Sequence, residues 1–414
     1  MQVVSFGCRN YKPFKGDVSV ELRPLTLVFG KNSSGKSALI RLMRLLLRAM
    51  SARCRGGFPL EVDELSFGTT FRDLIHGRSP HGSASFSLKL QGDEGVFDMN
   101  ASVQNIDETI APTGLPTEYS VVSRFELREP FPLRLDWIPA AATAPEYEGK
   151  GVVPFRGLMP SIGISLEAEC GGRLLQNWRV LIQEYEAEIE HLGPFRARID
   201  RVYSMGAKVP LGFDGSGAPI RLAVDDRLAD AVSTWYEANL DGWRLIISKP
   251  ASAFQCIIAR GNSWEVNLAD VGQGMQQVLP IVVQQLGHQL HGETGFLDII
   301  EQPELHLHTA AQAPLGELFL NTAKLRQGQA IVETHSENLL LRIRRLIAEG
   351  ADPALVALYW VDEQEDGCST VRRIHIDQDG NLDWWREGVF SEGYEEVRAI
   401  RRAVRGRTPS GEVR

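Results

Sequence analysis

The stretch that decides the fold is Gly30-Lys31-Asn32-Ser33-Ser34-Gly35-Lys36-Ser37, which has the pattern G-x-x-x-x-G-K-S. Residues 25–29 (LTLVF) form a short apolar run before it, and residues 38–47 follow with the apolar pattern of a helix. A strand, a glycine-rich loop and a helix in this order are the context in which the pattern wraps phosphate groups. We therefore predict that this stretch, the P-loop, binds a nucleoside triphosphate.

The residue types of the P-loop suit that chemistry. Its glycines let successive backbone N–H groups point into one concavity, and the N-terminus of the following helix attracts anions further. Lys36 is expected to reach the β- and γ-phosphates, and the Ser37 hydroxyl is expected to bind Mg²⁺. The predicted cofactors are therefore ATP and Mg²⁺.

The composition is that of a globular protein with a core of its own. Of the 414 residues, 43% are hydrophobic and 23% are charged. No apolar run approaches the roughly 18 to 20 residues that cross a membrane, and residues 1–6 do not resemble a secretory leader. These features predict a cytoplasmic protein without a membrane partner. The five cysteines form no C-x-x-C pair, so they indicate neither a zinc site nor a disulfide framework.

The charge disfavours binding of nucleic acid by the whole surface, because the net charge is −9. Local basic clusters leave nucleic acid open as a partner, although such clusters are more often solvated faces. The clusters are Arg196-Arg198-Arg201, Arg342-Arg344-Arg345 and Arg398-Arg401-Arg402-Arg405-Arg407.

The order of predicted elements indicates an α/β fold. Alternating runs between about 83 and 170 predict antiparallel hairpins, and helices are predicted at about 174–186, 226–240 and 309–325. The last third alternates helix and strand, which is typical of a mostly parallel sheet. We predict an N-terminal lobe with the P-loop and a β subdomain, a helical and β insertion that makes lid, partner or dimer contacts, a C-terminal ATPase lobe and a C-terminal segment. Their bounds are 1–170, 171–262, 263–375 and 376–414.

A second part of the site is predicted where an apolar strand, residues 296–300, ends in Glu301-Gln302-Pro303-Glu304. An acidic residue at such a strand end is where a second Mg²⁺-binding carboxylate belongs, so Glu301 is the expected metal ligand. Gln302 or Glu304 is expected near the attacking water. Asp298 interrupts the apolar run and makes this strand imperfect.

Two further motifs lie near these residues in the sequence. The strand 329–333 ends at Thr334-His335-Ser336, and an imidazole at that strand end could reach the γ-phosphate, although a lone histidine is more often a capping or core residue. The turn around Gly272, Gln273, Gly274 and Gln276 opens an apolar helix, which is a second possible anion-binding helix N-terminus.

Taken together, these motifs resemble the ABC-type ATPase heads of the RecF/SMC/OLD (overcoming lysogenization defect) superfamily, closest to the stand-alone AAA-type ATPases of bacterial antiphage defence. The resemblance covers most of the chain. It is carried by the P-loop, Phe67-Gly68, Gly193-Pro194-Phe195-Arg196, DVGQGMQQVLPI (270–281), IIEQPELHLH (299–308), ETHSE (333–337) and Trp384-Trp385-Arg386-Glu387-Gly388 with Phe390.

The resemblance implies an ABC-type fold with a mixed or parallel central sheet and an ATP site shared by two subunits. Residues 272–276 would be the signature that closes over the γ-phosphate of a second subunit. Glu301 would be the Walker B acid, and His335 the switch histidine that senses the γ-phosphate. The implied assembly is a homodimer or a higher homo-oligomer.

Two departures from the family pattern affect the expected chemistry. Gln302 stands where the catalytic glutamate usually lies, and an amide cannot accept a proton from water as a carboxylate does, so hydrolysis is expected to be slow unless Glu304 substitutes. Gly272 stands where many relatives have a serine that contacts the γ-phosphate.

Two features found in related ATPases are missing from the sequence. It has neither a heptad array for a coiled-coil arm nor an acidic cluster of the Toprim nuclease kind after His335. The predicted function is a dimeric ATPase that acts as sensor or scaffold of a defence complex and controls a separate nuclease or toxin. The alternatives are a RecF-like DNA-repair ATPase that binds DNA directly and the nucleotide-binding subunit of a transporter.

Overall fold

A six-stranded sheet lies at the centre of the computed structural model, which describes residues 1–54, 57–109, 116–139, 145–161, 169–207, 209–250, 252–261, 264–386 and 400. Five neighbouring strands are parallel and the last is antiparallel. In spatial order they are β14 (Ile189–Leu192), β19 (Leu297–Glu301), β20 (Gln329–Glu333), β3 (Leu25–Gly30), β21 (Val356–Glu363) and β22 (Ser369–Ile374).

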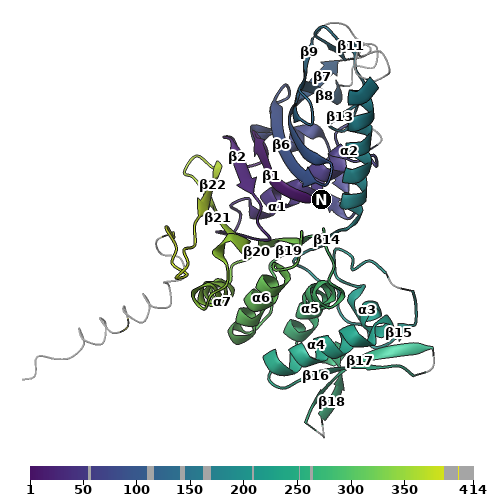
Figure 1. Ribbon diagram of the computed structural model, residues 1–414, viewed down its shortest axis with the longest axis vertical. Helices are drawn as coiled ribbons and strands as arrows, with labels where there is room; N and C mark the ends of the chain where they lie inside the picture. Colours follow the sequence, from purple (N-terminus) through teal and green to yellow (C-terminus); the bar gives the residue numbers. More distant parts are fainter. Residues whose placement is uncertain are drawn as a thin grey trace, which may run out of the picture.

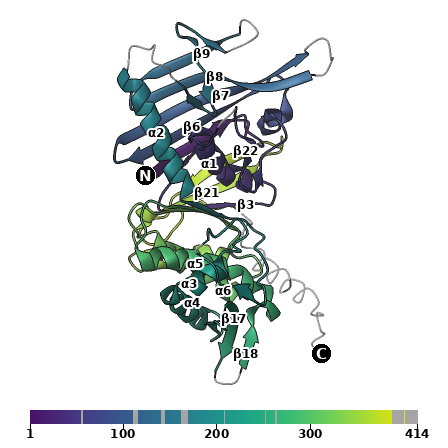
Figure 2. The same ribbon diagram turned by 90° about the vertical axis from the view of Figure 1, so that its right-hand side faces the viewer.

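One face of the central sheet is covered by α1 (Lys36–Met50), and beyond it lies an eight-stranded antiparallel sheet along which α2 (Glu169–Ala187) runs (Figures 1 and 2). The Trp178 ring of α2 packs 5.3 Å from Phe97 of that sheet. The strand order is β11 (Gly151–Val152), β10 (Glu146–Tyr147), β9 (Leu133–Ile138), β8 (Pro116–Glu129), β7 (Gly95–Thr109), β6 (Ser83–Gly92), β1 (Gln2–Arg9) and β2 (Val18–Glu21).

The other face of the central sheet is covered by helices, and a small sheet lies beyond them at the lower end of Figure 1. The helices are α3 (Ala218–Val224), α4 (Asp226–Asn239), α5 (Gln273–His291), α6 (Thr309–Thr322) and α7 (Glu337–Ala348). The small sheet contains β15 (Tyr203–Ser204), β16 (Arg244–Ser248), β17 (Ala253–Arg260) and β18 (Trp264–Asn267). Short elements complete the description: β4 (Glu61–Val62), β5 (Leu65–Ser66), β12 (Phe155–Arg156), β13 (Met159–Pro160), and 3-10 turns at Phe71–Leu74, His76–Arg78, Leu268–Asp270 and Pro353–Leu355.

The alternation of side chains along the central strands decides what each face can hold. Leu297 and Ile299 of β19 belong to the core beside α1, whereas Ile300 belongs to the core beside α5. Because successive residues of a strand point to opposite faces, Glu301 faces α1 and Asp298 faces α5. The apolar pattern of β19 is interrupted because the strand contributes one acidic residue to a polar cluster on each face of the sheet.

The expected α/β fold is confirmed, and so are the main predicted elements. The helices predicted at 174–186, 226–240 and 309–325 are α2, α4 and α6. The predicted domain bounds stay a prediction; α2 and β14, which fall in the predicted 171–262 unit, pack against α1 and pair with β19. Most of the predicted C-terminal segment 376–414, including Glu387, Gly388 and Phe390, lies outside the described residues. Within the described part of the chain, no helix is both long and apolar enough to cross a membrane.

Candidate nucleotide-binding site

The P-loop has a backbone that only particular residues can adopt. Gly30 and Gly35 have φ angles of 156° and 96°, and Ser33 has a φ of 63°. A Cβ atom on Gly30 would lie 2.3 Å from the Val361 carbonyl oxygen, so the loop can turn there only around glycine. Gly35 precedes α1 without a side-chain cap, which leaves the first N–H groups of the helix free to meet an anion. Lys31, Asn32 and Ser33 are exposed at the outer turn of the loop.

Lys36 and Ser34 are polar groups held under the loop. The Lys36 ammonium group donates to the Lys31 carbonyl oxygen at 2.7 Å. Burial lowers the pKa of Lys36, and the nearby Glu333 and Glu304 oppose that shift. The buried Ser34 hydroxyl has no hydrogen-bond partner. The loop therefore presents a cation, a hydroxyl and backbone donors to one place, which suits a polyphosphate.

Glu301 lies where the sequence predicts it, at the end of β19, and its carboxylate is already held. Arg41, one turn after Ser37 on α1, donates to both carboxylate oxygens at 2.7 and 2.6 Å. His191 of β14 shares a third hydrogen bond at 2.9 Å. Burial acts to raise the pKa of Glu301, but the hydrogen bonds from His191 and Arg41 outweigh it and lower the pKa. Glu301 is thus a carboxylate anion with three donors.

The neighbouring turn is fixed by its own contacts. Gln302 has a φ of 45°, and its N–H group donates to the Glu333 carbonyl oxygen at 2.8 Å. The buried Arg196 donates to the Glu301 carbonyl oxygen at 2.7 Å, while its Nε and Nη1 atoms have no partner. Arg196 therefore ties the Gly193–Arg196 motif of the sequence to the acidic turn.

His335 and Glu304 lie together. The Glu304 carboxylate accepts hydrogen bonds from the His335 N–H group at 2.6 Å and from the Thr334 hydroxyl at 2.7 Å. The His335 Nε2 atom is buried without a partner. Burial, followed by the charge of Lys36, lowers the pKa of His335 to about 4, so its ring is neutral at physiological pH. Glu304 therefore positions His335, and the roles predicted for the two residues, a base for Glu304 and a γ-phosphate switch for His335, stay predictions.

Arg41, His191 and Glu333 are site residues that the sequence analysis missed. Glu333 ends β20 as Glu301 ends β19, and the two residues are register neighbours. Burial raises the pKa of Glu333, a side-chain hydrogen bond from Ser37 lowers it, and the Glu301 charge raises it further. The sequence pattern could have indicated Glu333, because it too is an acidic residue at the end of an apolar strand. Arg41 was readable as the residue one helical turn after Ser37, whereas nothing in the sequence marks His191.

The predicted signature, residues 272–276, opens α5 on the other side of the central sheet. Gly272 caps the helix without a side chain, and Gln273 is exposed. Gly274 packs on the turn that follows Glu304, since a Cβ atom there would lie 2.5 Å from the His306 carbonyl oxygen. Gln276 is buried, and its side chain makes hydrogen bonds to backbone groups of Ile199 and Val271, which hold the start of α5 in place.

A hollow adjoins the signature. It is lined by Phe195, Arg196, Arg198, Ile199, Ala269, Val271, Gln273, Gln276, Gln277 and His306. The P-loop, in contrast, lies against Pro13, Phe14 and Val361. The P-loop helix packs in the core on one face of the central sheet and the signature helix in the core on the other. The structure thus brings Lys36, Ser37, Glu301, Glu304 and His335 together, whereas residues 272–276 open a helix on the other face of the central sheet and contact the turn at His306.

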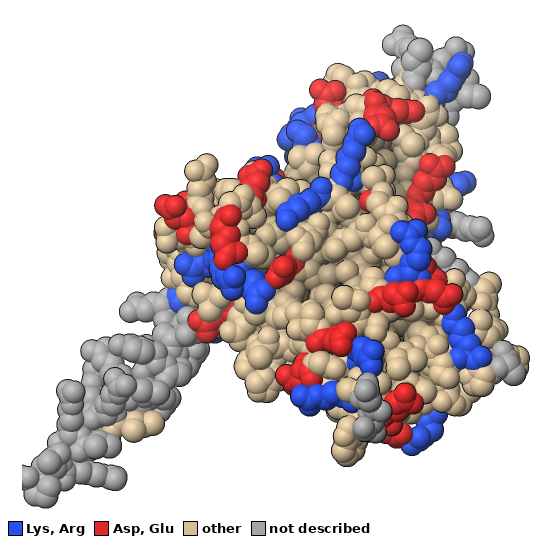
Figure 3. Space-filling model, turned by 60° about the horizontal axis from the view of Figure 1, so that its bottom comes forward, with Lys and Arg blue, Asp and Glu red and all other residues tan. Residues whose placement is uncertain are grey.

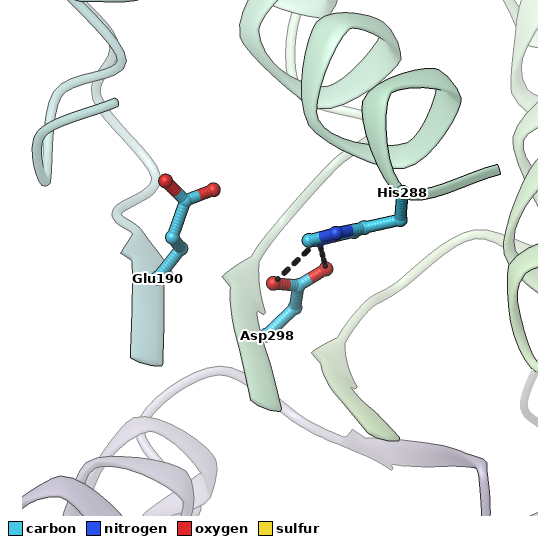
Figure 4. A group of neighbouring side chains, drawn as sticks. All are labelled: Glu190, His288 and Asp298. Carbon is cyan, nitrogen blue, oxygen red and sulfur yellow. Dashed lines mark hydrogen bonds and ion pairs between the residues drawn. The ribbon is translucent and has the colours of Figure 1, made fainter. Parts of the chain in front are cut away.

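A second polar cluster has the composition of a metal site but not its bonding. Glu190, His288 and Asp298 each offer a ligand atom, all within 4.8 Å of one another, and His288 faces the Asp298 carboxylate (Figure 4). Both oxygens of Asp298 accept from glutamine amides, Gln284 at 3.0 Å and Gln285 at 2.7 Å. Arg221 pairs with Glu190. Donors therefore already fill the cluster, and we read it as a buried ion-pair network that explains Asp298.

Comparisons with known proteins agree with this geometry. Residues 224–340 match a family described as an AAA ATPase domain. This stretch includes the predicted signature, Glu301 and His335. The chain is 25% identical over 397 residues to the OLD nuclease of Thermus scotoductus, and the match covers 90% of this chain and 66% of that protein. A crystal structure of an SMC head bound to the C-terminal winged-helix domain of ScpA superposes with a TM-score of 0.53 at 13% identity, over 91% of this chain and 99% of that one.

Proposed function

We propose that two copies of this chain, an ATPase head of the RecF/SMC/OLD type, close around ATP and act as the sensor or scaffold of a bacterial antiphage defence complex. A separate nuclease or toxin is the effector. The observation that carries the proposal is the separation of two half-sites. The P-loop helix and the signature helix pack on opposite faces of the central sheet. A second copy can supply the signature that this chain holds away from its own P-loop.

The P-loop half holds the triphosphate. Lys36 and the free N–H groups at the start of α1 bind phosphate oxygens, and the neutral His335 ring contacts the γ-phosphate through its unpartnered Nε2 atom. The Ser37 hydroxyl, together with a carboxylate at the end of β19 or β20, supplies oxygen atoms of the kind that Mg²⁺ prefers. Mg²⁺, when bound, offsets the negative charge of the phosphate oxygens.

Hydrolysis is slow in this proposal because the turn offers no free base. Gln302 carries an amide at the position nearest the attacking water, and an amide is not a general base. Both oxygens of Glu304 accept hydrogen bonds from Thr334 and His335. ATP binding therefore holds the dimer closed for long periods.

The separate effector is supported by the surroundings of the acidic residues that follow His335. Asp362 pairs with Arg386, and Asp366 accepts from the Cys368 N–H group at 2.9 Å. These contacts stabilise a hairpin and its turn. The chain spans 66% of the length of the OLD nuclease that it matches. In this proposal, the cleavage that the relative's name implies belongs to a separate protein.

The test is the mass of the purified protein with and without ATP-Mg²⁺, measured by light scattering after size exclusion. Lys36→Ala removes the phosphate contact, and Gln273→Glu puts an acid on the exposed signature; each variant alone is expected to stay monomeric. A mixture of the two variants contains one intact composite site and is expected to dimerise. A native protein that stays monomeric with bound ATP, or a mixture that stays monomeric, contradicts the proposal.

The RecF-like alternative rests on three basic clusters. Members of two of them have local contacts in the structure, and the arginines of the third, at 398–407, lie outside the described residues. Arg201 pairs with Asp270, Arg342 pairs with Glu317, and Arg196 is buried. On the face drawn in Figure 3, basic and acidic side chains alternate without a single-sign stripe. DNA affinity that falls steeply with salt would favour the alternative, because phosphate contacts release counterions.

A further inference from the structure

Within the nucleotide site of the proposed function, on which this inference rests, we propose that Glu333 is the carboxylate that holds the divalent cation beside Ser37. Glu301, the expected Walker B acid, acts instead as a positioning residue that holds Arg41 and His191. The metal site is thereby moved by one strand, from the end of β19 to the end of β20.

The first step is the placement of the two acids. Glu301 and Glu333 are register neighbours on parallel strands. Ile299 and Ile331, two residues earlier on each strand, lie in the core beside α1. Because side chains alternate along a strand, both carboxylates point to the same face, toward the start of α1. Either could serve a cation bound to Ser37.

The second step is that three hydrogen bonds already hold the Glu301 carboxylate. Arg41 takes both oxygens, and His191 takes Oε1 as well. Only 2% of the Glu301 side chain is exposed, so these groups replace water. A cation at this carboxylate would compete with a bidentate guanidinium, which is one of the stronger partners that a carboxylate has.

The third step is that one oxygen of the Glu333 carboxylate has no hydrogen-bond partner. This oxygen is the buried Oε2 atom. Ser37, the expected metal-binding hydroxyl, makes a side-chain hydrogen bond to the same carboxylate. The nearby Lys36 ammonium group donates to the Lys31 carbonyl oxygen. An unpaired oxygen on a buried acid is costly for the fold, which is typical of a group retained for a ligand.

The fourth step is that the backbone around Glu333 is rigid. Its carbonyl oxygen accepts from the Gln302 N–H group at 2.8 Å, and the Thr334 N–H group donates to the Val28 carbonyl oxygen at 3.1 Å. The carboxylate is therefore fixed between the acidic turn and β3, next to the P-loop. A preorganised oxygen ligand next to a serine hydroxyl suits a hard cation such as Mg²⁺ or Mn²⁺.

The experiment titrates Mn²⁺ into the full chain with saturating ADP, follows free Mn²⁺ by electron paramagnetic resonance, and measures ADP affinity separately in EDTA. Glu333→Gln is compared with Glu301→Gln and with the surface control Glu349→Gln. Glu333→Gln is expected to weaken Mn²⁺ binding at least about tenfold while ADP affinity in EDTA is unchanged. Glu301→Gln is expected to weaken Mn²⁺ binding less, and Glu349→Gln not at all.

Thermal unfolding without metal separates a ligand role from a structural one. Glu333→Gln removes a buried acid with one unpaired oxygen, so its Tm is expected to equal or exceed that of the native protein. Glu301→Gln weakens the contact with Arg41 and is expected to melt lower. Native Mn²⁺ affinity in Glu333→Gln, or a lower Tm together with unchanged affinity, overturns the inference. A native protein that binds no ADP overturns the proposed function itself, and the inference with it.

Discussion

Arg41 donates two hydrogen bonds to the carboxylate of Glu301, at 2.7 and 2.6 Å, and thereby joins the P-loop helix to the end of β19. The two residues are 260 positions apart in the chain. The contact fixes the orientation of α1, and with it that of Ser37, relative to the acidic turn. It also decides which carboxylate near Ser37 is free to take a ligand.

Removal of Arg41 is expected to destabilise the fold, because it leaves Glu301 as a buried anion with His191 as its remaining side-chain donor. The Arg41 side chain is 31% exposed, so we expect Arg41→Ala to cost about 2 kcal/mol, less than breaking a fully buried pair. Urea unfolding measures the change. In the matched cycle, Arg41→Ala placed in a Glu301→Gln background should cost clearly less, and equal costs in both backgrounds would show that the pair is not coupled.

Gln302→Glu is expected to raise ATP turnover, since it places a carboxylate where the family resemblance expects the catalytic glutamate. Positioned general bases contribute about 10²-fold or more, and we expect an increase of at least about tenfold. The measurement is steady-state phosphate release. The double variant Lys36→Ala/Gln302→Glu controls for a contaminating ATPase and should show no turnover. If Gln302→Glu turns over at the native rate, another group is the base.

His335 is expected to act as a neutral hydrogen-bonding group. Its pKa of about 4 predicts that kcat/KM, which reports the free enzyme, does not titrate with this residue between pH 5.5 and 8. His335→Gln keeps a neutral polar group and should retain ATP-driven dimerisation better than His335→Ala. An inflection between pH 6 and 7 that disappears in His335→Gln would show that the imidazole ionises in the working range.

The buried pair of His288 and Asp298 predicts a stability that falls in alkali. Burial acts to lower the pKa of His288, but the charges and hydrogen bonds of Asp298 and Glu293 outweigh burial and raise this pKa to about 10, above the ordinary histidine value of 6.5. The folded state therefore binds more protons than the unfolded state between these values. Its stabilisation is complete below pH 6.5 and is lost as pH rises toward 10, with a limiting slope of about 1.4 kcal/mol per pH unit.

Urea unfolding at several pH values measures that slope, and Asp298→Asn is the matched control. The variant removes the charge that raises the pKa of His288, so its stability should vary less between pH 7 and 10 than that of the native protein. Parallel pH profiles for the two proteins would show that this pair is not the source of the alkaline loss.

Several parts of the site could be predicted because their chemistry is local. The P-loop is one continuous stretch whose glycines are required by its own backbone angles, and Ser37 follows from it. Glu301 and His335 were predictable because each stands at or just after the end of an apolar strand. In a parallel sheet such ends meet at one edge, so their proximity follows from the order of elements.

The sequence by itself determined the α/β class, the main helices and central strands, the P-loop and the positions of Glu301, Glu304 and His335, because all of these depend on periodicity and on residues close in the chain. Only the tertiary structure decided how these groups are bonded. It joined Arg41 and His191 to Glu301 and left the Oε2 atom of Glu333 without a hydrogen-bond partner. It also placed residues 272–276 on the face of the sheet opposite to α1. The physical reason is strand register and the alternation of side chains. The partners of a carboxylate depend on which strands pair and on which face of the sheet its residue lies. A shift of one residue in register would move Glu301 from the face of the sheet beside α1 to the face beside α5.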